Sequence, residues 1–248
     1  MRPLRILWRG TLALLHLLAG VLIAPFVTRR DAAGFWTVER RVARWWHGRL
    51  LRILHIRVQT FGRPPDPPAL VVANHVSWLD IVVLGHLLPT VFLSKAEVRR
   101  WPLIGWLAKR AGTLFIRRGS GQAAVIRERI ARYLRHGGML ALFPEGTTSD
   151  GRQVRPFFSR LFAAAIDAET AVAPVALRYC VEGRLDPVAP YTDDQTLLAN
   201  LARLLGRPGS EVEVHFAEPI PAAGCERKAL AQAARARIVE ALERACRQ

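Results

Sequence analysis

The chain has 248 residues, with 36 Lys and Arg against 20 Asp and Glu, so its formal net charge at pH 7 is +16. This length accommodates one sizeable domain with an appendage, and the charge draws the protein toward anionic partners such as nucleic acid, an acidic membrane surface or an acidic protein. Hydrophobic residues make up 51% of the sequence and it contains no nucleic-acid-binding motif, so a membrane surface is favoured and nucleic acid is not expected as a partner. The three cysteines lack Cys-x-x-Cys spacing and indicate neither a disulfide framework nor a zinc site.

The first thirty residues predict a membrane-associating segment. An apolar run extends from Leu12 to Val27, with arginines on both sides of it. A bilayer-spanning helix needs about 20 apolar residues, so this run lies at the lower limit for a span. Three interpretations are open: a cleaved signal peptide, a single span, and a segment that enters one leaflet and leaves on the cytoplasmic side. The run lacks a clear small-x-small cleavage site, which disfavours the first, and we expect the third.

Residues 32–54 predict a second helix, because large apolar residues recur there at helical spacing. Five arginines fill much of the remaining surface, and Trp45 and Trp46 are adjacent. A basic amphipathic helix with paired tryptophans is typical of the headgroup layer of a membrane, although a surface helix packed on a domain has the same pattern. We therefore expect residues 1–54 to form membrane-associating helices and residues 55–248 to form an α/β domain.

The most informative stretch follows the apolar run from Ala69 to Ala73, which predicts a buried strand. Ser77 followed three residues later by Asp80 predicts a capping box at the start of a helix. His75 then lies in the strand-to-helix turn, and the Asp80 carboxylate can reach back toward it. A carboxylate on one imidazole nitrogen fixes the tautomer and leaves the other nitrogen free to accept a proton. The pattern predicts a general base, although a plain capping box beside a surface histidine fits the same spacing.

Two further predicted strands end in polar turns. The strand at 112–116 is followed by Arg117 and Arg118, whose guanidinium groups suit a phosphate monoester, although solvated surface arginines give the same pattern. The strand at 139–143 leads into Pro-Glu-Gly-Thr-Thr-Ser at 144–149, which is either a simple turn closed by Pro and Gly or part of a binding site. Because α/β folds bind ligands at the carboxyl ends of their strands, both turns predict substrate contacts.

The remaining pattern alternates strands and helices. Strands are expected at 56–61, 90–93, 171–177 and 211–216, and helices at 101–109, 122–135, 157–168 and 226–247. Pro174 lies within one of these strands, and a proline predicts an edge or bulge position. This order predicts an α/β fold.

Four sequence blocks together resemble the glycerolipid (lysophospholipid) acyltransferase family, in particular the bacterial 1-acylglycerol-3-phosphate acyltransferases. In chain order they are Asn-His-x-x-x-x-Asp at 74–80, Gly-Thr-Leu-Phe-Ile-Arg-Arg at 112–118, Phe-Pro-Glu-Gly-Thr-Thr-Ser at 143–149 and Val-Ala-Pro-Val at 172–175. The first and third blocks are highly specific in combination, whereas any one block alone is weak.

The resemblance implies a mixed, largely parallel sheet flanked by helices. It also implies an O-acyltransferase in which His75 and Asp80 are catalytic. His75 deprotonates the free hydroxyl of a lysolipid, which attacks the thioester of acyl-CoA or acyl carrier protein, so no cofactor or metal is expected. In the family pattern the functional arginine of the second block corresponds to Arg118, and Pro174 lies in the block that shapes the acyl-binding side. The substrate-binding residues that we expect are Asn74, Ser77, Arg117, Arg118, Glu145, Gly146, Thr147 and Thr148.

The acceptor is open between two lysolipids. Lysophosphatidic acid, acylated at its sn-2 hydroxyl to give phosphatidic acid in phospholipid synthesis, is the leading expectation. Relatives commonly carry a basic residue directly after a Pro-Phe pair, where this chain has Phe158. A lyso-ornithine lipid, whose headgroup lacks phosphate, is therefore the alternative. Either acceptor implies a location at the cytoplasmic face of the bacterial inner membrane.

Two other classes of protein are less consistent with the sequence. A non-catalytic basic peripheral membrane protein explains the charge and the N-terminal region, but it does not explain His75 and Asp80 ahead of two further polar turns. A serine hydrolase that uses Ser77 is disfavoured, because the sequence has no Gly-x-Ser-x-Gly elbow.

Overall fold

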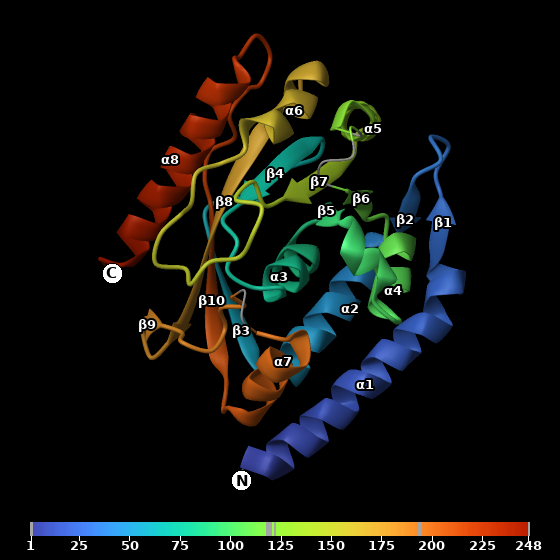
Figure 1. The fold of residues 1–248 in the computed structure, drawn as a ribbon, viewed down its shortest axis with the longest axis vertical. Helices are drawn as coiled ribbons and strands as arrows, with labels where there is room; N and C mark the ends of the chain where they lie inside the picture. Colours follow the sequence, from blue (N-terminus) through green and yellow to red (C-terminus); the bar gives the residue numbers. More distant parts are fainter. Residues whose placement is uncertain (1, 118–120, 122, 193–194, 248) are drawn as a thin grey trace.

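A computed structural model describes residues 2–117, 121, 123–192 and 195–247. Arg118, a predicted substrate-binding residue, lies outside the described residues. Within this part of the chain a central eight-stranded sheet has the order β3-β10-β8-β4-β7-β5-β6, with β9 paired to β8 (Figure 1). The strands are β3 (Ile56–Phe61), β4 (Ala69–Ala73), β5 (Val91–Lys95), β6 (Leu114–Ile116), β7 (Met139–Leu142), β8 (Val172–Val181), β9 (Arg184–Leu185) and β10 (Ser210–Phe216).

The sheet is mixed and largely parallel, as the sequence predicts. β4 is parallel to both β7 and β8, β5 is parallel to both β6 and β7, and β3 is parallel to β10. Antiparallel pairing joins β8 to β10 and to β9. The parallel strands from β4 to β6 thus end at one edge of the sheet, and α/β folds usually bind their ligands at this edge.

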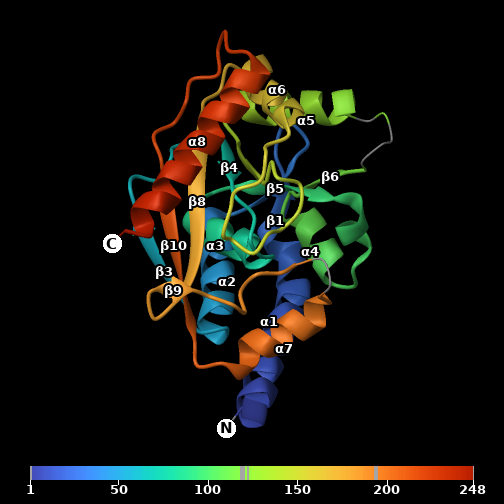
Figure 2. The ribbon, with the colours of Figure 1, turned by 60° about the vertical axis from the view of Figure 1, so that its left-hand side comes forward.

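Helices cover both faces of the sheet (Figures 1 and 2). β4 is buried at every position, with Val71 and Ala73 in one hydrophobic cluster and Leu70 and Val72 in the other. The first cluster includes residues of α2 (Arg40–Ile53), α3 (Leu79–Leu87) and α7 (Leu197–Gly206), and the second includes residues of α5 (Ala123–Arg135), α6 (Ala163–Asp167) and α8 (Arg227–Ala245). A strand buried on both faces has no polar alternation, which explains the uninterrupted apolar run in the sequence.

Two local predictions are wrong. The segment 32–54 is not one helix, because Trp36–Val38 (β2) pairs with Thr28–Arg30 (β1) through a turn containing Gly34, and the helix begins only at Arg40. The segment 157–168 is a 3-10 turn (Ser159–Phe162) followed by the short α6. The short helix expected at 101–109 does form, but it begins three residues later, since α4 spans Ile104–Arg110. The helix α7 was not predicted.

Pro174 does not lie at a sheet edge, because β8 is paired on both sides. Its carbonyl accepts a hydrogen bond from the N–H of Ala217, just beyond the last paired residue of β10. In a strand the N–H and C=O of one residue point to the same side, so the missing proline N–H faces the place where β10 has already left the sheet. A central strand tolerates proline there without losing a ladder hydrogen bond.

α1 (Arg2–Val27) lies along one side of the domain, where it contacts α2, α4 and α7 (Figure 1). The Arg9 guanidinium donates to the carbonyl of Arg207 at 2.7 Å, and the His16 ring stacks on Trp46 with centroids 3.6 Å apart. By length and composition α1 is able to cross a membrane. Its large exposed apolar residues are Leu4, Leu7, Trp8, Leu14, Leu15, Leu18, Leu22, Ile23 and Phe26.

α2 is packed into the same domain as the central sheet. Its Leu51, together with Leu54 just after the helix, belongs to the same hydrophobic cluster as β4, and the helix packs on α3. The division at residue 54 proposed from the sequence therefore does not coincide with a break in packing, and removal of residues 1–54 would also remove core side chains.

We expect Gly20 to be required for the docking of α1 on α2. A Cβ atom at Gly20 would lie 2.2 Å from a ring carbon of Trp46, whereas one at Gly10 in the same helix would lie 3.7 Å from Leu205. Gly20→Ala should therefore loosen α1, at a cost of about 1–3 kcal/mol for the overpacking. Gly10→Ala is the matched control and should keep or slightly raise stability, because alanine favours helix. Amide hydrogen exchange across α1 measures the difference, and equal protection in the two variants would contradict the prediction.

Candidate active site

His75 and Asp80 meet in the turn between β4, which ends at Ala73, and α3, which begins at Leu79. The His75 Nδ1 atom lies 2.7 Å from Asp80 Oδ2. In the neutral tautomer Nδ1–H donates to the carboxylate, and Nε2 keeps the lone pair that can accept a proton. The His75 side chain is 18% exposed and that of Asp80 is 0% exposed. The imidazole is thus accessible while its carboxylate partner is shielded from water.

The buried carboxylate of Asp80 is held on both oxygens. Besides His75, Oδ2 accepts the backbone N–H groups of Val76 at 2.8 Å and Ser77 at 3.0 Å. Oδ1 accepts the hydroxyl of Tyr179 at 2.7 Å. These donors hold the Asp80 carboxylate in place beside the imidazole of His75.

Tyr179, on β8, is a functional candidate that sequence reasoning missed. Burial, and then the Asp80 carboxylate, raise the pKa of the Tyr179 phenol well above its usual range, so it remains a hydrogen-bond donor. The sequence carries only a weak signal for it, namely that a tyrosine within an apolar strand needs a buried hydrogen-bond partner.

The turn at 143–149 holds His75 from the other side. The Phe143 ring stacks on the imidazole with centroids 4.0 Å apart and planes 10° apart. Glu145 is buried; its Oε1 accepts the backbone N–H of His75 at 2.8 Å, and its Oε2 accepts the backbone N–H of Arg155 at 2.9 Å. Burial raises the pKa of the Glu145 carboxyl, and these two N–H donors act in the opposite direction. In this geometry Glu145 positions the turn that carries His75, and its contact with substrate stays a prediction.

Asn74 and Ser77 are buried at the two ends of the same turn. The Asn74 side-chain amide donates to the carbonyl of Leu177 at 2.9 Å and accepts its N–H at 2.8 Å, so it continues the β4–β8 ladder like one more peptide group. Ser77 is 0% exposed, and Trp78 rather than Ser77 is the N-cap residue of α3. Only half of the predicted capping box forms, the half in which Asp80 accepts the N–H of Ser77. Neither side chain is available to a substrate in this geometry.

The other predicted substrate-binding residues remain predictions. Gly146 takes a left-handed φ of 73° in the turn after Phe143, and its N–H donates to the Phe143 carbonyl. Thr148 donates through its hydroxyl to the carbonyl of Tyr191, and Thr147 lies beside it in the same turn. Arg117 is exposed just after β6, three strands from β4, which corresponds to about 14 Å at the usual strand spacing.

The arrangement is suited to general-base chemistry. The Nδ1 atom of the accessible His75 imidazole is held by a buried carboxylate. Its Nε2 atom can therefore take a proton from a hydroxyl and later return it. The described residues contain no group of three or more His, Cys, Asp or Glu side chains placed to hold a metal ion. The His75–Asp80 contact gives the site an oriented proton acceptor at the carboxyl end of a buried strand.

Comparisons with known proteins agree with this chemistry. A model of the family named Acyltransferase matches residues 55–178. The chain is 45% identical over 245 residues to the lyso-ornithine lipid O-acyltransferase of Pseudomonas aeruginosa, covering 98% of this chain and 95% of that one. It is 38% identical over 159 residues, 62% of each chain, to the 1-acyl-sn-glycerol-3-phosphate acyltransferase of Neisseria gonorrhoeae.

The fold has a known counterpart. The crystal structure of the 1-acyl-sn-glycerophosphate acyltransferase of Thermotoga maritima matches with a TM-score of 0.64 at 21% identity, over 98% of both chains. The family match includes the first and third sequence blocks, and these are the blocks that the fold brings together around His75. The chain therefore belongs to the acyltransferase family, and it is an O-acyltransferase that acts on lysolipids.

Proposed function

We propose that the protein acylates the free hydroxyl of a lyso-ornithine lipid, with His75 as the general base and an acyl thioester of CoA or of acyl carrier protein as donor. The contact of 2.7 Å between His75 Nδ1 and Asp80 Oδ2, beside an exposed edge of the imidazole, is the observation that carries the chemical part. The choice of acceptor is supported by the relatives and by one residue of the sequence, Phe158.

The reaction needs little from the protein beyond positioning and proton transfer. His75 Nε2 accepts the hydroxyl proton as the hydroxyl oxygen attacks the thioester carbonyl carbon. When the tetrahedral intermediate collapses, the carbon–sulfur bond breaks and the thiolate takes the proton from the imidazolium. Asp80 stabilises the imidazolium without itself accepting the proton. Because the thioester is already activated, no nucleophilic side chain is required.

Lyso-ornithine lipid moves ahead of lysophosphatidic acid as the proposed acceptor. The Pseudomonas lyso-ornithine lipid O-acyltransferase is 45% identical along nearly the whole chain, whereas the Neisseria enzyme named for the phosphate-bearing acceptor is 38% identical over 62% of it. Phe158, which is exposed, stands where relatives commonly carry a basic residue. Ornithine carries an ammonium group, and a basic side chain at that place would repel it. 1-Acylglycerol-3-phosphate is the second candidate, favoured by the Neisseria relative.

We also propose that α1 lies in the cytoplasmic leaflet of the bacterial inner membrane. Its apolar residues face outward along its length, while Arg9 and His16 are buried against the domain. A helix that is attached lengthwise to a water-soluble sheet layer is better placed in the plane of the interface than across the bilayer. Lipid acceptors would then reach the domain from the leaflet in which α1 lies.

His75→Ala should lower acyl transfer by about 10²–10⁴-fold, the usual contribution of a general base. Asp80→Asn should also lower it, because an amide does not hold the imidazole in the required tautomer. Radiolabelled acyl transfer to lyso-ornithine lipid and to lysophosphatidic acid, each with acyl-CoA and acyl carrier protein as donors, measures both effects. Undiminished transfer by His75→Ala would refute the general base, and efficient turnover of lysophosphatidic acid alone would refute the proposed acceptor.

Tyr179→Phe should lower kcat by about tenfold with little change in KM, since Tyr179 acts on Asp80 and does not touch substrate. The buried carboxylate also loses a donor, so stability should fall by about 1–3 kcal/mol. Tyr133→Phe is the matched control, because Tyr133 lies in the cluster on the opposite face of the sheet. Steady-state kinetics with thermal unfolding separate the two effects, and a Tyr179→Phe variant with unchanged kcat would show that Tyr179 is not a positioning residue.

A further inference from the structure

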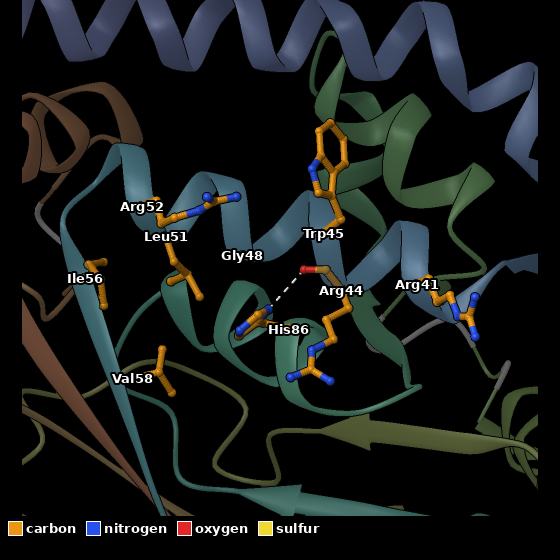
Figure 3. Close-up of a pocket in the computed structure, with 9 residues that line it drawn as sticks. All are labelled: Arg41, Arg44, Trp45, Gly48, Leu51, Arg52, Ile56, Val58 and His86. Carbon is orange, nitrogen blue, oxygen red and sulfur yellow. Dashed lines mark hydrogen bonds between the residues drawn. The ribbon is translucent and has the colours of Figure 1, made fainter.

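A cavity of about 490 Å³ lies between α2, α3 and β3, away from the catalytic turn (Figure 3). His75 precedes the first turn of α3, whereas His86 of the cavity lies in the last turn of the same helix. The cavity is therefore separate from the site at His75 and lies at the other end of α3. Its lining residues are Arg41, Arg44, Trp45, Gly48, Leu51, Arg52, Ile56, Val58 and His86.

The lining combines a basic rim with an apolar floor. Arg41, Arg44 and Arg52 are exposed residues of α2, and none of them forms an ion pair with a described residue. The described lining includes no Asp or Glu to balance them. Leu51 and Ile56 at the floor are almost fully buried. Unpaired guanidinium groups above an apolar surface are complementary to an anionic headgroup with a hydrocarbon tail.

The cavity is built by a close approach of two helices. Gly48 of α2 lies against His86 of α3, where a Cβ atom would come within 2.7 Å of the imidazole. His86 Nδ1 lies 3.0 Å from the carbonyl oxygen of Arg44, and a dashed line joins them in Figure 3. This contact anchors the imidazole to the backbone of α2 beside the arginines. The shape of the cavity is thus set by backbone packing and not by loose surface side chains.

The cavity adjoins the surface that we propose to meet the membrane. Trp45, 48% exposed, is one of its lining residues, and its ring lies 6.2 Å from His16 of α1. α1 packs on α2 and carries the exposed apolar residues named above. A lipid in the same leaflet as α1 would therefore reach the cavity without leaving the membrane interface.

We propose that this cavity binds one anionic phospholipid of the bilayer, separately from the acceptor at His75. The lipid phosphate lies against Arg41 and Arg44, which are one turn apart on α2 and whose guanidinium groups can bind it in bidentate fashion. Part of one acyl chain covers Leu51, Ile56 and Val58. The bound lipid holds α2 at the interface by a specific contact, in addition to the general attraction that the net charge of the protein produces.

The test uses two double variants of α2 that remove the same charge. Arg41→Gln/Arg44→Gln changes the cavity, whereas Arg40→Gln/Arg49→Gln changes arginines of the same helix that do not line it. The full-length protein in non-ionic detergent is titrated calorimetrically with dihexanoyl-phosphatidylglycerol below its micelle concentration. Dihexanoyl-phosphatidylcholine and inorganic phosphate are titrated in parallel.

We expect the cavity variant to bind phosphatidylglycerol at least about tenfold more weakly, a loss of about 1.4 kcal/mol, and the control variant to change less than about twofold. Phosphatidylcholine and inorganic phosphate should bind the unaltered protein much more weakly. Equal weakening in the two variants would overturn the proposal in favour of general electrostatic attraction. Equal affinity for phosphatidylcholine, or for phosphate alone, would overturn the assignment to an anionic phospholipid. Equal thermal midpoints for the two variants exclude misfolding as the cause.

Discussion

The Asp80 carboxylate, 0% exposed, is the group around which the site is built. An isolated carboxylate in such a place would be unstable by several kcal/mol unless its oxygens accepted hydrogen bonds. The donors come from His75, from two backbone N–H groups of the same turn and from Tyr179 on β8. Because each donor must be in place at once, the turn, α3 and β8 are held in a single arrangement, and the imidazole has one orientation.

The elements around this carboxylate are themselves tied to the sheet. Asn74 clamps the end of β4 to β8, and Glu145 joins the turn after β7 to the backbone of His75. On the far side, the indole N–H of Trp78 donates to Asn200 of α7, and the N–H of Tyr191 donates to the carbonyl of Val76. α7 in turn packs on α1. The catalytic turn is therefore continuous, through packed elements, with the helix that we place in the membrane.

Charge and apolar surface are divided between two tasks. The proton-transfer site uses buried carboxylates and backbone groups, whereas the exposed arginines of α2 and the apolar residues of α1 lie on the periphery. This division lets a strongly positive protein approach an anionic bilayer while His75, the general base, remains next to the Asp80 carboxylate. Because the membrane-facing residues lie in α1 and α2, the N-terminal sequence alone does not distinguish an acyltransferase from a non-catalytic lipid-binding protein.

The sequence by itself determined that His75 and Asp80 share one strand–turn–helix and lie within reach of each other, because this proximity depends on neighbours in the chain and on the direction of helical side chains. The alternation of apolar runs also determined an α/β fold. Only the tertiary structure decided that Asn74 and Glu145 bind backbone, that Tyr179 holds Asp80 and that Pro174 lies in a central strand. Each of these depends on which strand lies beside which, and local periodicity carries no information about a partner some seventy to one hundred residues away.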